Sequence, residues 1–333
     1  MDKKLKRGQN LSVISFNENY KKIIEPVKNN LDKLDEYFSE YFSNRINEKN
    51  HILPIIKDFL SNRGKRIRPV LIFLMLHALN RDIDDFLYKL AMANELIHNA
   101  TLIHDDIIDC SIMRRGEKTI NFNYDSKLAV LAGDYLLSEV LKLLADTEDK
   151  NIRKIHSDAV SKIIKGELNQ YFNRFKILSI EQYIEKSKDK TARLFEAGLV
   201  SAYIYNTKNA DNIDKVKDFA LNFGIAFQIY NDLENLSNPE KLNEDVQNGD
   251  YSAPLIFFAR EKYGEDVKSL NNVNQALKQI KNTDAVSKTK ELAKYYINLA
   301  IENVSFLEDN LYKQAIIEMC TLYAQTYEMN NDG

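Results

Sequence analysis

Carboxylates and guanidinium groups lie close together in one stretch of the sequence, residues 94–116. Asp105 and Asp109 are four residues apart, so on a helix both carboxylates project from one face. Two like charges placed in this way repel each other unless a cation lies between them. Arg114 and Arg115 follow; arginine binds phosphate through a planar fork, while Mg²⁺ takes one or two carboxylates together with water and phosphate oxygens. The pattern is expected where Mg²⁺ meets an oligophosphate; the alternative is a solvated helix end with internal ion pairs.

Basic residues gather around Gly64, directly after a predicted short helix at 52–61. The glycine breaks that helix, and Pro69 lies where a new helix can start. Backbone N–H groups near a helix start, together with Lys65 and Arg68, would make a cradle for an anion. The alternative is a positively charged loop that lies on the surface.

Two later segments carry polar side chains within apolar patterns. Lys190 and Thr191 lie midway along a predicted helix, where a lysine is most often solvated. On the helix predicted at 216–236, Gln228 and Asn231 share one face. Because buried unpaired amides are costly, we expect this face to line a wet cavity.

Residues that break helices are scarce in this chain. Its 333 residues include ten Gly and five Pro, which predicts an all-α protein of long helices. The helix predicted at 127–145 is apolar enough to be central, with Asp134 buried or facing a cavity. No linker, repeat or low-complexity tract divides the chain. We therefore expect a flexible tail at 1–18 and one domain at 19–333, a bundle of long helices around a central cavity.

Composition and charge exclude several other classes of protein. Lys and Arg number 46 against 49 Asp and Glu, so the net charge gives no reason to expect a nucleic-acid partner. No apolar run reaches the roughly 18 residues that suggest a membrane span, and the basic N-terminal segment does not resemble a signal peptide. The two cysteines form no CxxC motif and no disulfide framework. We therefore expect a cytoplasmic location.

The motifs above, with one further run, make the chain similar to the trans-polyprenyl synthetases. They occur in that family's order: GKRIRP at 64–69, HNATLIHDDIID at 98–109 with RRG at 114–116, AVLAGDYLL at 129–137, KT at 190–191 and FGIAFQIYND at 223–232. The resemblance implies an isoprenoid synthase-like fold and Mg²⁺-dependent condensation of isopentenyl diphosphate with an allylic diphosphate to a linear trans-polyprenyl diphosphate. It also implies a homodimer, with the apolar helices at 86–103 and 128–145 available for the interface.

The resemblance also implies roles for single residues. Gly64 would belong to the substrate-binding site, and four side chains would bind isopentenyl diphosphate, namely Lys65, Arg68, His98 and Arg115. Asp105 and Asp109 would hold Mg²⁺ on the allylic diphosphate. Four more side chains would complete the allylic site, namely Arg114, Lys190, Thr191 and Gln228. The catalytic set is Asp105, Asp109, Lys190 and Gln228, in a site where pre-placed cations stabilise the departing diphosphate.

The second aspartate-rich motif departs from the family pattern. It should read close to DDxxD, but residues 231–235 read NDLEN, which leaves Asn231 and Asp232 as the metal ligands. An amide oxygen carries no formal charge, so we expect this metal site to be weaker. Two acidic residues remain as displaced ligands, Glu234 and Asp245. Two others stand where the family has lysines, Glu240 and Asp250.

Two other functions remain open beside that of a prenyltransferase. Terpene-cyclising lyases of the same fold also pair an aspartate-rich motif with a second motif that contains Asn, but they have no use for residues that bind isopentenyl diphosphate. An assisting subunit of a heteromeric synthase is the other alternative. The altered second motif favours it, and the intact first motif argues against it.

Small side chains lie about one turn before the first metal ligand. Ala100 and Thr101 precede Asp105 by five and four residues, where family members that stop early carry an aromatic ring, and Ile97 is next on that face. The resemblance therefore implies an open channel and a product of geranylgeranyl length or longer. The alternative is that these residues are small so that helices can pack closely.

Overall fold

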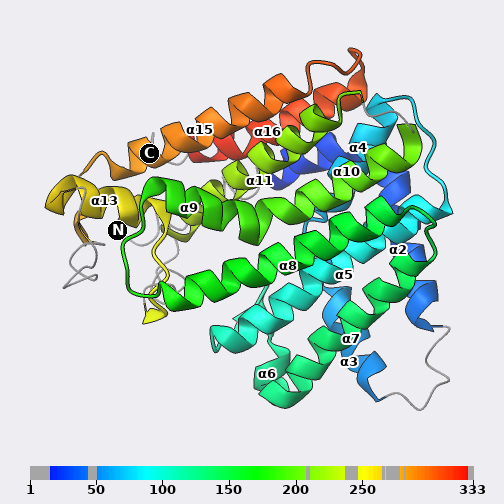
Figure 1. Ribbon diagram of the computed structural model, residues 1–333, viewed down its shortest axis with the longest axis horizontal. Helices are drawn as coiled ribbons and strands as arrows, with labels where there is room; N and C mark the ends of the chain where they lie inside the picture. The colour runs from blue at the N-terminus through cyan, green and yellow to red at the C-terminus, as the bar shows by residue number, and fades with distance from the viewer. Residues whose placement is uncertain are drawn as a thin grey trace. The chain divides into compact units, whose positions relative to one another are not determined.

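The computed structural model describes residues 16–43, 51–207, 211–236, 247–264, 267, 278–280 and 283–328. Helices make up most of them, and the strands among them are the two-residue β1 (Met113–Arg114) and β2 (Glu117–Lys118) of one hairpin (Figure 1). The predicted all-α class is confirmed. Residues 16–18, the end of the predicted tail, are helical. Residues 1–15, Glu240 and Asp245 lie outside the described residues.

Contacts within the chain divide it into two compact units, named here after the aspartate-rich motif that each contains. The first-motif unit is Pro26–Ser157 with Ala197–Ala210. The second-motif unit is Met1–Glu25, Asp158–Glu196 and Asp211–Gly333. The organisation as one domain at 19–333 stays a prediction. Among the described helices, none has both the length and the apolar character needed to cross a membrane.

In the first-motif unit, α5 (Asp85–Ile108) packs against four other helices. These are α2 (Lys28–Ser43), α4 (Ile67–Ala78), α6 (Ile120–Asn123) and α7 (Ser126–Ala145). The helix α3 (Ile52–Ser61) has the predicted bounds. The Asp84 side chain accepts a hydrogen bond from the backbone N–H of Leu87 (3.1 Å), which caps the start of α5. Nearly every residue of α5 from Leu87 to Ala100 is buried, and each large apolar side chain so buried contributes roughly 1.5–3 kcal/mol.

Helix α7 differs from its prediction. One face packs on α5, but the other leaves Leu131 61% and Leu141 72% exposed. The side chain of Asp134 is also 61% exposed, so the prediction that it is buried or faces a cavity is wrong for the single chain. The apolar composition of α7 does not predict this exposure, because α5 and α6 of its own unit cover only part of its surface.

In the second-motif unit, α11 (Ile213–Leu236) packs against α15 (Ala285–Asn303) and several shorter elements. The others are α9 (Ile180–Ser187), the π-helix η2 (Lys188–Ala192), α13 (Ala253–Tyr263) and α16 (Leu311–Glu328). Two helices contribute residues to both units, α8 (Lys150–Phe172) and α10 (Arg193–Thr207). Aromatic rings fill the core beside α11: the Phe195 ring meets that of Phe223 edge-on at 5.3 Å.

The π-helix η2 lies close to α11 because of one glycine. A Cβ atom on Gly224 would lie 2.5 Å from the Cα atom of Ala192, a distance that no folded chain tolerates without a shift. The absence of that atom lets the two backbones approach. It thereby brings Thr191 of η2 next to Gln228, one turn beyond Gly224 on α11.

Candidate active site

Asp105 and Asp109 lie at the end of α5, one helical turn apart. Asp109 caps the helix, and its backbone N–H donates to the carbonyl of Asp105 (2.8 Å). Both side chains are partly buried. No group of three or more His, Cys, Asp or Glu residues that could enclose a metal occurs in the described part of the chain. The pair therefore fits an ion such as Mg²⁺, which takes one or two carboxylates and leaves its remaining positions to water and phosphate.

Asp106, between these two residues, forms an ion pair with Arg114. It is 2% exposed, and its Oδ1 accepts from both Nε (2.7 Å) and an Nη atom (2.6 Å) of Arg114. A buried carboxylate needs such a partner, and a charge-assisted pair is stronger than a neutral one. Arg114, predicted for the allylic site, is thus held beside the carboxylate pair.

The guanidinium group of Arg115 is held against Gly64. One Nη atom of Arg115 donates to the carbonyl of Asn62 (2.8 Å). A Cβ on Gly64 would lie 2.7 Å from the guanidinium carbon of Arg115, and the φ of Gly64 is +58°, in the left-handed region that favours glycine. Lys65, next in the chain, is exposed.

His98 lies in the positive field of the arginines. Burial lowers the pKa of its ring well below the usual value, and the guanidinium groups of Arg68, Arg115 and Arg114 lower that pKa further. The ring is therefore neutral at pH 7, with one N–H donor for a phosphate oxygen. The field that keeps this ring neutral would attract a diphosphate.

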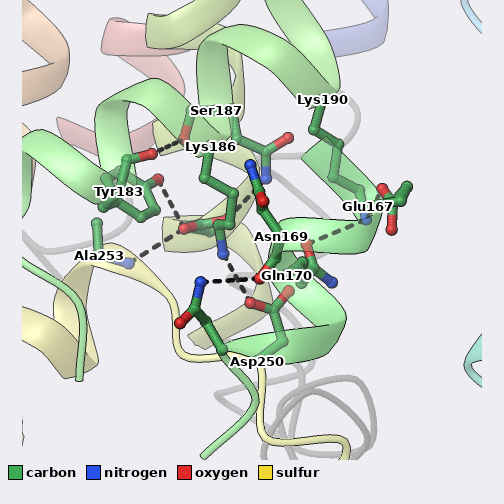
Figure 2. A network of polar contacts seen from close by, with 12 residues as sticks. Glu167, Asn169, Gln170, Tyr183, Lys186, Ser187, Lys190, Asp250 and Ala253 are labelled. Atoms are coloured by element: carbon green, nitrogen blue, oxygen red, sulfur yellow. Dashed lines mark hydrogen bonds and ion pairs between the residues drawn. The ribbon is translucent and has the colours of Figure 1, made fainter. Parts of the chain in front are cut away.

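Of four predicted residues of the second-motif unit, Lys190 pairs with Glu167 (Figure 2) and the other three form a hydrogen-bonded series. Nζ of Lys190 lies 2.7 Å from Oε1 of Glu167. The hydroxyl of Thr191 donates to Oε1 of Gln228 (2.7 Å), and Nε2 of Gln228 donates to Oδ1 of Asp232 (2.9 Å). Lys190, Gln228 and Asp232 border a hollow within this unit, lined by Gln170, Lys186, Ser187, Lys190, Gln228, Asp232, Asp250 and Ser252.

Asp232 uses both carboxylate oxygens within the protein. Besides the bond from Gln228, its Oδ2 accepts from the Tyr183 hydroxyl (2.7 Å) and from the backbone N–H of Ala253 (3.1 Å). It is 6% exposed; burial raises its pKa, and the charge of Lys186 opposes the rise. The role of Asp232 as a metal ligand stays a prediction. The role of Asn231, which is partly buried, stays a prediction.

Sequence reasoning missed Lys186 and the partners of Asp232. Nζ of Lys186 lies 2.6 Å from Oδ1 of Asp250. Burial disfavours the charge on Asp250, but the ammonium groups of Lys186 and Lys190 outweigh burial, and the pKa of Asp250 is lowered. One signal was present: Asp250 replaces an expected lysine, and Lys186 lies one turn before Lys190. A search for a compensating charge near Lys190 would have found it.

The residues predicted to set product length lie on α5. Ala100 and Ile97 are fully buried. Thr101 is partly buried, and its hydroxyl donates to the carbonyl of His98 (2.8 Å). Their effect on the product stays a prediction.

Comparison with known proteins gives consistent matches over most of the chain. The model of the polyprenyl synthetase family matches residues 49–295. A prenyl transferase of Cyanidium caldarium is 30% identical over 314 residues, which cover 90% of this chain and 96% of that protein. Solanesyl diphosphate synthase 1, chloroplastic, of Arabidopsis thaliana is 30% identical over 77% of this chain and 67% of its own length. The crystal structure of a geranylgeranyl pyrophosphate synthase from Lactobacillus brevis superposes with a TM-score of 0.80 at 25% identity, covering 90% of this chain and 97% of that one.

Proposed function

Because this chain belongs to the polyprenyl synthetase family, we propose that it is a Mg²⁺-dependent trans-polyprenyl diphosphate synthase. It would condense isopentenyl diphosphate with an allylic diphosphate to a linear trans-polyprenyl diphosphate. The observation that carries the proposal is the first-motif unit itself. There a neutral His98 in the field of three arginines accompanies the carboxylate pair Asp105 and Asp109. A cyclase that uses a single diphosphate substrate has no need of such a second anion site.

Different side chains of the chain would bind the two diphosphates and Mg²⁺. Lys65, Arg68, His98 and Arg115 would hold the diphosphate of isopentenyl diphosphate. Asp105 and Asp109 would hold Mg²⁺, which when bound supplies positive charge to the departing diphosphate. Arg114, Lys190, Thr191 and Gln228 would bind the allylic diphosphate.

In the reaction the allylic C–O bond breaks, the electron pair leaves with the diphosphate, and the isopentenyl double bond attacks the allylic carbon. A proton then leaves the product to restore an allylic double bond. Cationic side chains already in place stabilise the charge as it forms, because they need no reorganisation.

We propose a product of geranylgeranyl length or longer. The small side chains of Ala100 and Thr101 support it, and so does the similarity to a protein named as a solanesyl diphosphate synthase.

We also propose a homodimer with the exposed face of α7 as its interface. Val130, Leu131 and Leu141 are exposed there, and adjacent exposed apolar side chains mark interaction surfaces. Leu131→Glu should then convert a dimer to a monomer in light scattering after gel filtration. A dimer unchanged by this variant would exclude that face. A cytoplasmic location stays a prediction from the sequence.

One incubation tests the function. The purified chain receives Mg²⁺, isopentenyl diphosphate and an allylic primer, and products are identified by mass spectrometry. Elongated diphosphates support the proposal. Hydrocarbons would indicate a cyclase, and no product would indicate an assisting subunit. Asp105→Asn with Asp109→Asn is the matched control, because it removes two charges and keeps the side-chain shapes.

A further inference from the structure

Lys186 lies in the hollow of the second-motif unit and is not among the residues proposed to bind substrate or metal. Its side chain is 13% exposed. Its ammonium group lies 2.6 Å from Oδ1 of Asp250 and 5.6 Å from the centre of the Tyr183 ring. In Figure 2 the side chains of Lys186 and Asp250 point toward one another. Because burying an ammonium group is costly, its presence at this depth requires either a structural or a functional reason.

The charges around the hollow favour a functional reason. Its eight lining residues include two lysines, Lys186 and Lys190, and two aspartates, Asp232 and Asp250. The positive and negative charges of this lining are equal only because Lys186 is present. Without it the lining would carry an excess negative charge and would repel a diphosphate. With it, a diphosphate meets two ammonium groups, each with three N–H donors.

The second motif offers a metal ion little negative charge. The carboxylate of Asp232 already accepts hydrogen bonds from Gln228, Tyr183 and Ala253. The residues at the two ends of the motif are amides, Asn231 and Asn235, which bring no charge. Mg²⁺ sites are built from carboxylates with phosphate and water, and among the described residues of this unit no three His, Cys, Asp or Glu side chains lie together as a metal site.

The remaining contacts hold Lys186 in place. Asp250 accepts from its Nζ, and the Tyr183 ring lies beneath it. Tyr183 is fixed in turn by its hydroxyl, which donates to Asp232. Asp232 also orients Gln228, whose Oε1 receives the Thr191 hydroxyl. Asp232 and Asp250 therefore act as positioning residues for the donors that face the hollow.

We propose that Lys186 takes the place of a metal ion in the second-motif unit and donates directly to a diphosphate oxygen of the allylic substrate. This inference rests on the proposed function and adds a binding residue to it. The enzyme would then need only the Mg²⁺ that Asp105 and Asp109 would hold. The ammonium group supplies a permanent charge that does not depend on the Mg²⁺ concentration.

Binding of inorganic pyrophosphate to the full-length protein tests the role of Lys186. Isothermal titration is run in EDTA on the parent and on Lys186→Gln, Asp250→Asn and Lys188→Gln. Lys188 is the matched control, since it lies two residues away and pairs with Glu185 outside the hollow. Lys186→Gln should weaken metal-free binding roughly tenfold, because a charge-assisted hydrogen bond is lost. Lys188→Gln should match the parent.

Asp250→Asn separates a ligand from a structural ion pair. It removes the negative charge of the pair but keeps the ammonium group and an amide oxygen that can still position it, so binding should be retained or become tighter. A purely structural pair predicts that Lys186→Gln and Asp250→Asn weaken binding equally. That outcome, or unchanged binding in Lys186→Gln, would overturn the inference. Circular dichroism at 222 nm verifies that each variant is folded.

Mn²⁺ counting by electron paramagnetic resonance, with pyrophosphate present, tests the metal part. Asn231→Ala should bind as many Mn²⁺ ions as the parent, and Asp105→Asn should bind fewer. Loss of an ion in Asn231→Ala would show a metal in the second-motif unit and overturn the inference. Failure of the proposed function would be seen in a different experiment. The parent protein would then form no elongated product in the incubation with both substrates, whatever result the pyrophosphate titrations give.

Discussion

A methyl group added at Gly64 should weaken the binding of isopentenyl diphosphate through Arg115. In Gly64→Ala the new Cβ would start 2.7 Å from the Arg115 guanidinium carbon, so the guanidinium group must move. Its hydrogen bond to the carbonyl of Asn62, now 2.8 Å, would be lost or lengthened. That exposed bond contributes about 1 kcal/mol, and a misplaced charge-assisted bond to phosphate costs roughly 1.5–3 kcal/mol more. Since about 1.4 kcal/mol is a factor of ten, KM for isopentenyl diphosphate should rise about tenfold or more.

Gly116→Ala is the control for backbone strain. Gly116 also has a positive φ, +84°, but among the described residues no heavy atom lies within 4 Å of the position of its Cβ. Each substitution should lower the free energy of unfolding by roughly 1–2 kcal/mol, because alanine is strained in the left-handed region. Steady-state kinetics with each substrate varied in turn measures the two KM values. Only Gly64→Ala should raise KM for isopentenyl diphosphate, with KM for the allylic primer near that of the parent. Equal effects of the two variants on this KM would refute the reasoning.

Three further outcomes are expected. Asp105→Ala or Asp109→Ala should lower kcat at least about a hundredfold, because charge stabilisation of the transition state is lost. Circular dichroism should show an intact helical fold, and a near-normal rate would contradict the metal assignment. Ala100→Phe should shift the product to shorter lengths in chromatography of the dephosphorylated alcohols, with activity retained; an unchanged distribution would place the channel elsewhere. Burial lowers the pKa of His156 to about 4 from a usual value of 6.5. Between these pH values the unfolded chain binds a proton that the folded chain does not. The stability that the neutral ring contributes above pH 6.5 is therefore lost as the pH falls. His156→Gln should flatten this fall by up to about 1.4 kcal/mol per pH unit in urea unfolding at pH 6.5 and 5, and an unchanged slope would count against the buried neutral ring.

Local signals predicted the helices and much of the first-motif unit. The Asp84 cap and the break at Gly64 act within a few residues, so the bounds of α3 and the start of α5 follow from the sequence. The pairing of Lys186 with Asp250 spans 64 positions and depends on how residues just before α13 lie against α9. No local pattern encodes such a pair. The exposure of Asp134 was missed for a related reason, because apolar composition does not say which face of a helix its own unit covers.

The π-helix η2 has a consequence for insertions and deletions in this gene. A π turn holds one residue more than an α turn, so the chain carries a single surplus residue between 188 and 192. A deletion of one codon here would let α9 continue as an ordinary α-helix, with little loss of helix content. It would also rotate the following residues by about 100°, and Thr191 would no longer meet Gln228. Selection should therefore remove one-codon deletions in this segment even though they relieve an irregular turn.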